Sequence, residues 1–117
     1  MALTRDFKET VQARVRRDPA FRKALLRDGI ESLLAGDVET GKTVLRDYIN
    51  ATVGFEGLGS VTQRSPKSLM RMFGPKGNPQ ARNLFAIVAY LQRQEGVRLE
   101  VRAARAGVTG ATAADRR

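Results

Sequence analysis

The apolar residues in the first half of this chain recur at the three- and four-residue spacing of helices, and two residue pairs interrupt the pattern. Asp18-Pro19 joins a favoured helix N-cap to the residue best suited to the first helical position. Gly36-Asp37 joins a helix stop to another N-cap. These signals predict three successive helices, at residues 4–17, 19–35 and 38–53.

Shorter helical segments follow. Two short helices are expected at residues 55–62 and 66–73, and a longer one at residues 79–93. Asn78 is the expected N-cap of the longer helix, Pro79 its first residue and Gly96 its end. The predicted fold class is therefore all-α, a small bundle of about six helices.

Residues 97–101 depart from the helical pattern. Their sequence, Val-Arg-Leu-Glu-Val, alternates apolar and charged residues, which predicts a short C-terminal β-strand. Because a lone strand leaves its edges unpaired, it is expected to pair with another segment, and its copy in a second subunit is one candidate, with Val97, Leu99 and Val101 as dimerisation residues. The N-terminal helices are the alternative dimer contact. Residues 102–117 lack any periodicity and are expected to form a disordered basic tail.

Basic residues are concentrated in one segment. The net charge is +9, and residues 64–82 contain five basic residues and no acidic one. They are Arg64, Lys67, Arg71, Lys76 and Arg82. The rest of the chain is nearly balanced in charge, and a local basic cluster of this kind is typical of a polyanion-binding protein, although a solvated surface that aids solubility explains the cluster alone equally well.

Cysteine and histidine are both absent. We therefore expect no thiol chemistry, no histidine-based hydrolase dyad and no histidine-containing metal site. The sequence predicts neither a cofactor, a metal nor an enzymatic activity. The first residues lack the apolar run of a signal peptide and no segment resembles a membrane span, so a cytoplasmic protein is expected.

Residues 36–43, Gly-Asp-Val-Glu-Thr-Gly-Lys-Thr, match the phosphate-loop pattern letter for letter. That loop follows a buried strand, whereas here helical spacing precedes the match, and Asp37 and Glu39 would face the anion. We interpret the segment as a capped helix start with an exposed Lys42. A nucleotide-dependent enzyme is the least favoured hypothesis.

The two short helices each have an apolar side, and the second also has a cationic one. The expected inward side chains are Phe55, Leu58, Thr62, Leu69, Met72 and Phe73. The expected outward side chains are Arg64, Lys67, Ser68 and Arg71. A break of about three residues separates the two helices, which is the arrangement of a helix-turn-helix.

Three consecutive segments carry a resemblance. They are Gly54-Phe55-Glu56-Gly57-Leu58-Gly59-Ser60-Val61-Thr62, Ser65-Pro66-Lys67-Ser68-Leu69-Met70-Arg71-Met72-Phe73 and Gly74-Pro75-Lys76-Gly77-Asn78-Pro79. Together they resemble the phage-repressor-like helix-turn-helix of the probable addiction-module antidote family, which is bacterial, and the last segment is the most specific match. The resemblance covers residues 54–101, so residues 1–53 are interpreted as an N-terminal helical extension.

Two positions depart from the family pattern. Gly59 stands where alanine is usual, and glycine loosens a helix by about 1 kcal/mol. Gln63 stands where the turn glycine is usual, and a left-handed backbone there would strain a residue that has a Cβ.

The resemblance implies binding to double-stranded DNA through the second short helix. The implied base-reading residues are Lys67, Ser68 and Arg71. The implied phosphate contacts are Arg64, Ser65, Lys76, Asn78 and Arg82. The hypothesis is a sequence-specific transcriptional regulator that binds a two-fold operator as a homodimer. The alternatives are an autorepressing antitoxin that neutralises a small toxin, as the resemblance implies, and a protein-binding adaptor with a degenerate helix-turn-helix.

Overall fold

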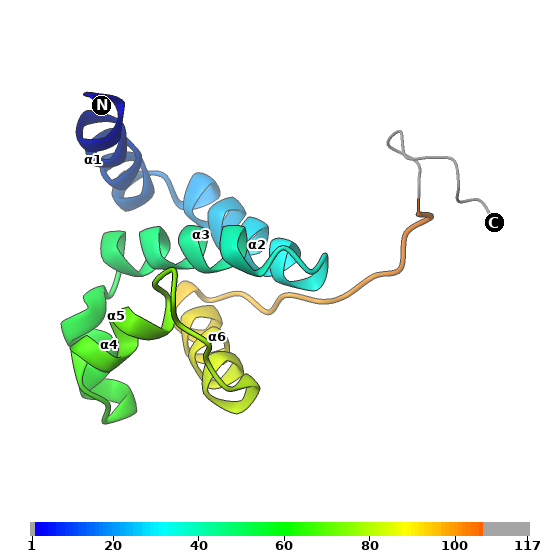
Figure 1. The fold of residues 1–117 in the computed structure, drawn as a ribbon. Helices are drawn as coiled ribbons and strands as arrows, with labels where there is room; N and C mark the ends of the chain where they lie inside the picture. Colours follow the sequence, from blue (N-terminus) through cyan, green and yellow to red (C-terminus); the bar gives the residue numbers. More distant parts are fainter. Residues whose placement is uncertain (1, 107–117) are drawn as a thin grey trace.

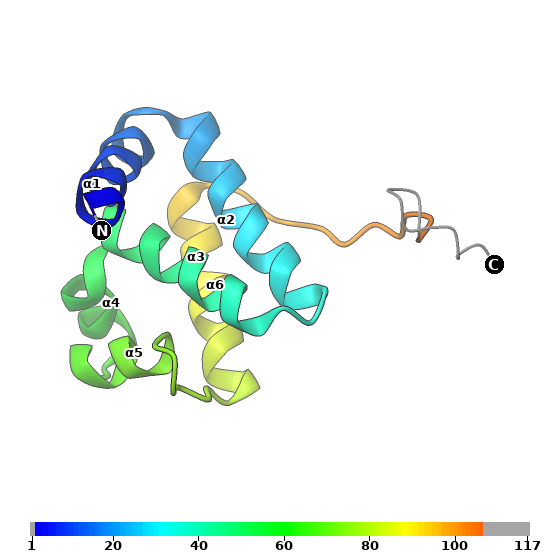
Figure 2. The same cartoon turned by 45° about the horizontal axis from the view of Figure 1, so that its top comes forward.

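The computed structural model describes the backbone of residues 2–106 and the side chains of residues 10–106. This part of the chain is all-helical, as predicted, with six helices. They are α1 (Ala2–Arg17), α2 (Pro19–Leu34), α3 (Val38–Ala51), α4 (Gly54–Thr62), α5 (Pro66–Met72) and α6 (Ala81–Glu95). In Figures 1 and 2, α3 lies centrally, with α1 and α2 on one side and α4 and α5 on the other. No helix within residues 2–106 is long and apolar enough to cross a membrane.

The predicted N-caps of α2 and α3 are present. Asp18 Oδ1 accepts the N–H of Phe21 at 3.2 Å, and Asp37 Oδ1 accepts the N–H of Thr40 at 3.3 Å. Each bond satisfies an amide that the helix itself leaves without a partner. The hydrogen bond from Phe21 lowers the pKa of the Asp18 carboxyl below its usual value, as expected for an N-cap carboxylate.

Two glycines allow α2 and α3 to cross closely. A Cβ at Gly41 would lie 2.7 Å from Leu33 Cδ2 and 3.0 Å from the Gly29 carbonyl oxygen. A Cβ at Gly29 would in turn lie 3.0 Å from Leu45 Cδ2. Larger residues at these positions would force the helices apart.

The core forms where α3, α4, α5 and α6 meet beneath α2. Its buried side chains are Leu26, Leu45, Tyr48, Ile49, Phe55, Leu58, Leu69, Phe73, Ile87, Val88 and Leu91. Because this core draws on both the N-terminal helices and the last three, residues 1–53 are not a separately packed appendage. They supply part of the core against which α4 and α5 pack.

A buried polar cluster links α2, α3 and α6. Arg22 Nε lies 2.8 Å from both carboxylate oxygens of Glu95, and Arg22 Nη1 donates to the Val15 carbonyl at 3.0 Å. The Tyr48 hydroxyl donates to Glu95 Oε1. Burial and the bond to Glu95 raise the pKa of Tyr48 above its usual value, so the hydroxyl keeps its proton and remains a donor.

The last helix begins later than predicted. Asn78 is not its N-cap and Pro79 is not its first residue, because Gln80 takes the N-cap position and α6 starts at Ala81. The loop before it is held in place: Lys42 of α3 donates to the Gly77 carbonyl at 2.8 Å, and a Cβ at Gly77 would be 2.0 Å from the Arg71 carbonyl oxygen at the end of α5. Residues 78–80 therefore run without helical structure from that contact to the start of α6. The predicted end of the helix at Gly96 is confirmed, with φ +75°.

The predicted β-strand at residues 97–101 is not found, and residues 2–106 contain no strand at all. A strand requires a neighbouring segment, and the hydrogen bonds recorded here go instead to α6. The Val97 N–H donates to the Gln92 carbonyl at 3.0 Å, and the Leu99 N–H donates to Gln92 Oε1 at 2.7 Å. Residues 97–106, here called the C-terminal arm, leave the helices along an extended path in Figure 1. Most of the predicted disordered tail, residues 107–117, lies outside the described residues.

Candidate nucleic-acid interface

The two short helices pack through their apolar sides, as predicted. Phe55 and Leu58 of α4 are buried, as are Leu69 of α5 and Phe73, which caps its C-terminus. The rings of Phe55 and Phe73 lie 6.2 Å apart and are tilted by 55°. This shared core fixes the two helices against each other and leaves the other side of α5 exposed.

The turn between α4 and α5 has a left-handed residue. Gln63 adopts φ 59° and ψ 40°, the conformation that usually requires glycine. Gly59 explains how the chain closes the turn: its carbonyl accepts the Arg64 N–H at 3.2 Å, and a Cβ on it would lie 2.6 Å from the Arg64 carbonyl oxygen. Glycine at position 59 thus allows a close backbone approach that alanine would obstruct.

Gln63→Gly is expected to raise the free energy of unfolding by up to about 1 kcal/mol, because it relieves the left-handed strain of a residue with a Cβ. Urea denaturation followed by circular dichroism measures the change. Gln63→Ala is the matched control, since it also removes the side-chain amide but retains the Cβ. Equal stability of the two variants would contradict the inference that the backbone of Gln63 is strained.

Ser65 starts α5 as its N-cap. Its Oγ accepts the Ser68 N–H at 3.0 Å and lies 3.0 Å from the Ser68 Oγ. Pro66 follows at the first helical position. Both serines are exposed, but their hydroxyls are already paired with each other, so they form one polar unit at the N-terminal end of α5.

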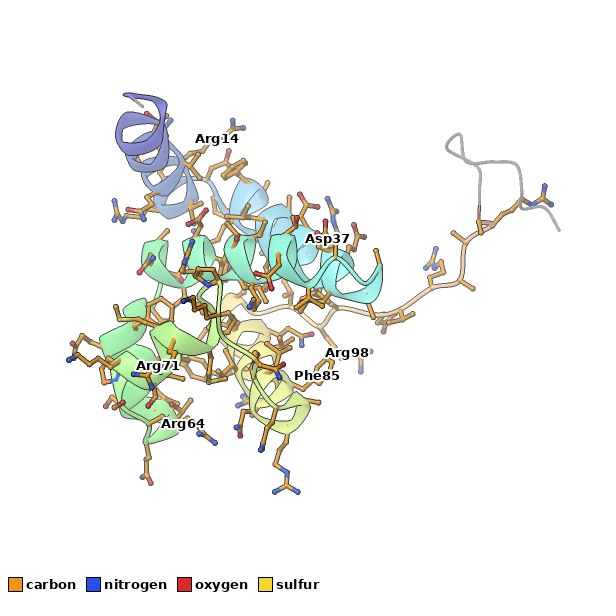
Figure 3. The ribbon with its side chains drawn as sticks, in the orientation of Figure 1. Arg14, Asp37, Arg64, Arg71, Phe85 and Arg98 are labelled. Atoms are coloured by element: carbon orange, nitrogen blue, oxygen red, sulfur yellow. The ribbon has the colours of Figure 1, made fainter. Side chains whose placement is uncertain are left out.

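The outward side of α5 and the loop after it form a shallow groove. Of the predicted contact residues, it brings together Arg64, Ser68, Arg71, Lys76 and Asn78. Lys67 is exposed on α5 but does not line the groove, and Arg82 lines a second depression that it shares with Arg64. In Figure 3, Arg64 and Arg71 lie at the end of the molecule formed by α4 and α5, far from Arg14 on α1.

Gln80 and Asn83 at the start of α6 also line the groove, and no pattern in the sequence indicated either of them. The Asn83 Oδ1 accepts a hydrogen bond from Arg64 Nη2 at 2.6 Å, which holds the guanidinium between α5 and α6. An asparagine near a helix start is an ordinary feature of sequences. Its role is visible only once the fold places α6 beside the turn.

Lys42 is not exposed, contrary to the sequence-based expectation. Its side chain is 1% exposed, and its Nζ donates to the carbonyls of Gly74 at 2.9 Å and Gly77 at 2.8 Å. The ammonium also lies 3.2 Å from Glu39 Oε2. Residues 36–43 therefore form the N-cap and the first turns of α3. Lys42 binds the two carbonyls of the loop that contains Lys76.

The chemistry of the groove suits a polyanion. Arginine and lysine side chains line it, and residues 64–82 contain no carboxylate to repel phosphate.

No cluster of three or more potential metal ligands occurs among the described residues. Of the predicted dimerisation residues, Val97 and Leu99 are partly buried against the chain's own core, while Val101 is 82% exposed.

No family model, no curated protein and no solved structure matches the chain.

Proposed function

We propose that this protein is a sequence-specific DNA-binding transcriptional regulator, and that α4 and α5 form its helix-turn-helix. One observation carries the proposal: α5 buries Leu69 on one side while Arg71 and Lys67 project from the other, beside the basic loop at Lys76. A helix with this division of faces can enter a major groove while its buried side remains fixed to the domain. Binding as a homodimer to a two-fold operator is part of the proposal.

The proposed roles follow the position of each side chain. Arg71 and Lys67 on α5 read bases, because extended basic side chains reach the acceptor edge of guanine. Lys76 and Asn78 in the loop, with Arg64 and Arg82 beside them, contact phosphates and set the register of the protein on the duplex. At the start of α5, Ser68 reads a base, and Ser65, whose hydroxyl is paired with that of Ser68, contacts a phosphate.

Arg71→Ala is expected to cost about 1–3 kcal/mol of affinity for duplexes that wild-type protein selects from a random pool, and to relax specificity at one position. Lys67→Ala should behave similarly. Fluorescence anisotropy with selected and scrambled duplexes measures both effects. If neither substitution changes the preference for the selected duplex, α5 is not the recognition helix.

Two further variants sharpen that experiment. Lys76→Ala should weaken binding to selected and scrambled duplexes alike and reduce the slope of log affinity against log salt by about 1, as expected for a phosphate contact. Lys23→Ala is the matched control, since Lys23 is an exposed lysine on α2, and α2 and α5 lie on opposite sides of α3 in Figure 2. A loss of affinity in the control would indicate a general charge effect.

An antitoxin role is the second candidate. The family resemblance is its main support, and the structure adds exposed apolar side chains at the turn between α2 and α3, away from α5: Leu34 is 63% exposed and Val38 is 46% exposed. A small toxin bound there would leave the groove at α5 free for DNA. Co-purification of one small protein encoded beside this chain, lost on Leu34→Glu, would support the role. A protein complex without any salt-sensitive DNA binding would instead favour an adaptor.

A further inference from the structure

We propose that residues 97–101 form the dimer contact by pairing antiparallel with the same residues of a second copy, in the one register that places Leu99 opposite Leu99. The inference deepens the proposed homodimer and rests on that part of the proposed function, but it involves no residue assigned to DNA. Its support is the orientation of the backbone groups in the arm and the order of the side chains along it.

The two edges of the arm differ in their backbone hydrogen bonds: one edge is bonded to α6, and the other has no partner within residues 2–106. The N–H groups of Val97 and Leu99 both donate to Gln92 of α6. In an extended segment, alternate residues present their backbone groups to the same edge, so the N–H and C=O groups of Arg98 and Glu100 face away from α6. Within residues 2–106 the N–H groups of Arg98 and Glu100 have no hydrogen-bond partner. This free edge is the kind that pairs with another strand.

The side chains of the arm are self-complementary about Leu99. Antiparallel pairing centred there sets Val97 opposite Val101 of the second copy and Arg98 opposite its Glu100. Two opposite-charge pairs and two valine pairs result, and cross-strand pairs of these types stabilise a sheet. Pairing Arg98 with Glu100 across the two copies also uses the backbone groups on the free edge, so hydrogen bonding and charge select the same register.

The environment of the arm fits this partner. A two-stranded ribbon is marginal by itself, but Val97 and Leu99 already pack against the core and would support it from behind. Val101, which is 82% exposed in the single chain, would gain an apolar neighbour. Arg98 lies on a different side of the molecule from Arg64 and Arg71 in Figure 3, so the contact leaves the proposed DNA-binding surface uncovered.

Charge exchange tests the register. In the single chain, Arg98 Nη2 lies 2.9 Å from Glu100 Oε2, and both side chains are largely exposed, so substitutions here spare the core. Wild-type protein should be a dimer by sedimentation equilibrium. Arg98→Glu and Glu100→Arg should each weaken the dimer at least about tenfold, because like charges then face each other in both cross-strand pairs.

The decisive sample is an equimolar mixture of the two single variants. One carries two acidic and the other two basic residues at these positions, so the mixture should form a heterodimer by native mass spectrometry. The double variant Arg98→Glu/Glu100→Arg should regain the homodimer. Arg102→Glu, the same charge change on the exposed arm outside the paired segment, should leave the dimer intact.

Three results would overturn the inference: a monomeric wild-type protein, single variants that remain fully dimeric, or a mixture that fails to associate. None of these measurements contains DNA. A dimer with the predicted charge pattern that shows no DNA preference would therefore contradict the helix-turn-helix assignment alone. A monomer that loses its selected duplex on Arg71→Ala would contradict the arm pairing alone.

Discussion

Arg22→Ala is expected to lower the free energy of unfolding by about 3–5 kcal/mol, because it leaves the buried Glu95 carboxylate without its ionic partner. The Glu95 side chain is 3% exposed, and Arg22 Nε lies 2.8 Å from each of its oxygens. Without the guanidinium, the Tyr48 hydroxyl is the remaining donor recorded for that carboxylate. A loss of this size is a large share of the 5–15 kcal/mol typical of a domain, so the variant should unfold at markedly lower urea concentration.

Arg27→Ala is the matched control for this experiment. It removes an arginine from the same helix, but Arg27 is 56% exposed and its partner Asp28, at 3.7 Å, is 58% exposed. Exposed pairs of this kind contribute about 0–1 kcal/mol. The double variant Arg22→Ala/Glu95→Gln should be more stable than Arg22→Ala, because no charge is then buried without a partner. Similar stability of Arg22→Ala and Arg27→Ala would show that the Glu95 carboxylate is not desolvated.

The helices could be predicted from sequence because their signals are local. Asp18 and Asp37 cap helices through amides three residues away, and Gly96 ends α6 with a positive φ. The outward side of α5 could be predicted for the same reason: once Leu69 is placed inward, the helical period sets the direction of Lys67 and Arg71.

The buried charges could not be predicted in this way. Arg22 and Glu95 are 73 residues apart, and Lys42 is 32 residues from Gly74. In sequence, each of these charged residues fits the polar side of a helix, and only the packed fold shows that its partner lies within hydrogen-bonding distance. The late start of α6 was missed for a related reason, because the loop before it is held by Lys42 at the Gly74 and Gly77 carbonyls and the local capping signal of Asn78 and Pro79 does not report this contact.

Lys42→Met is expected to lower the free energy of unfolding by about 2–4 kcal/mol, because two carbonyls lose a charged donor while the methionine roughly keeps the volume. The Lys42 side chain is 1% exposed, whereas that of its ionic partner Glu39 is 68% exposed. The loss therefore comes from the Gly74 and Gly77 carbonyls and not from a stranded carboxylate. Lys23→Met is the control: it removes an exposed lysine and should change the stability by less than about 0.5 kcal/mol.

The same substitution should also weaken DNA binding under conditions where the variant is fully folded. Lys42 holds the loop at both Gly74 and Gly77, on either side of Lys76, so its removal frees the residue assigned to phosphate without touching α5. Affinity for selected and scrambled duplexes should then fall by a similar factor, of about tenfold, as for a lost phosphate contact and not a lost base contact. Thermal melts and anisotropy on the same preparation separate the two effects. A destabilised variant that binds both duplexes as tightly as wild-type protein would make Lys42 a purely structural residue, whereas a selective loss on the selected duplex would mean that the loop positions α5 itself.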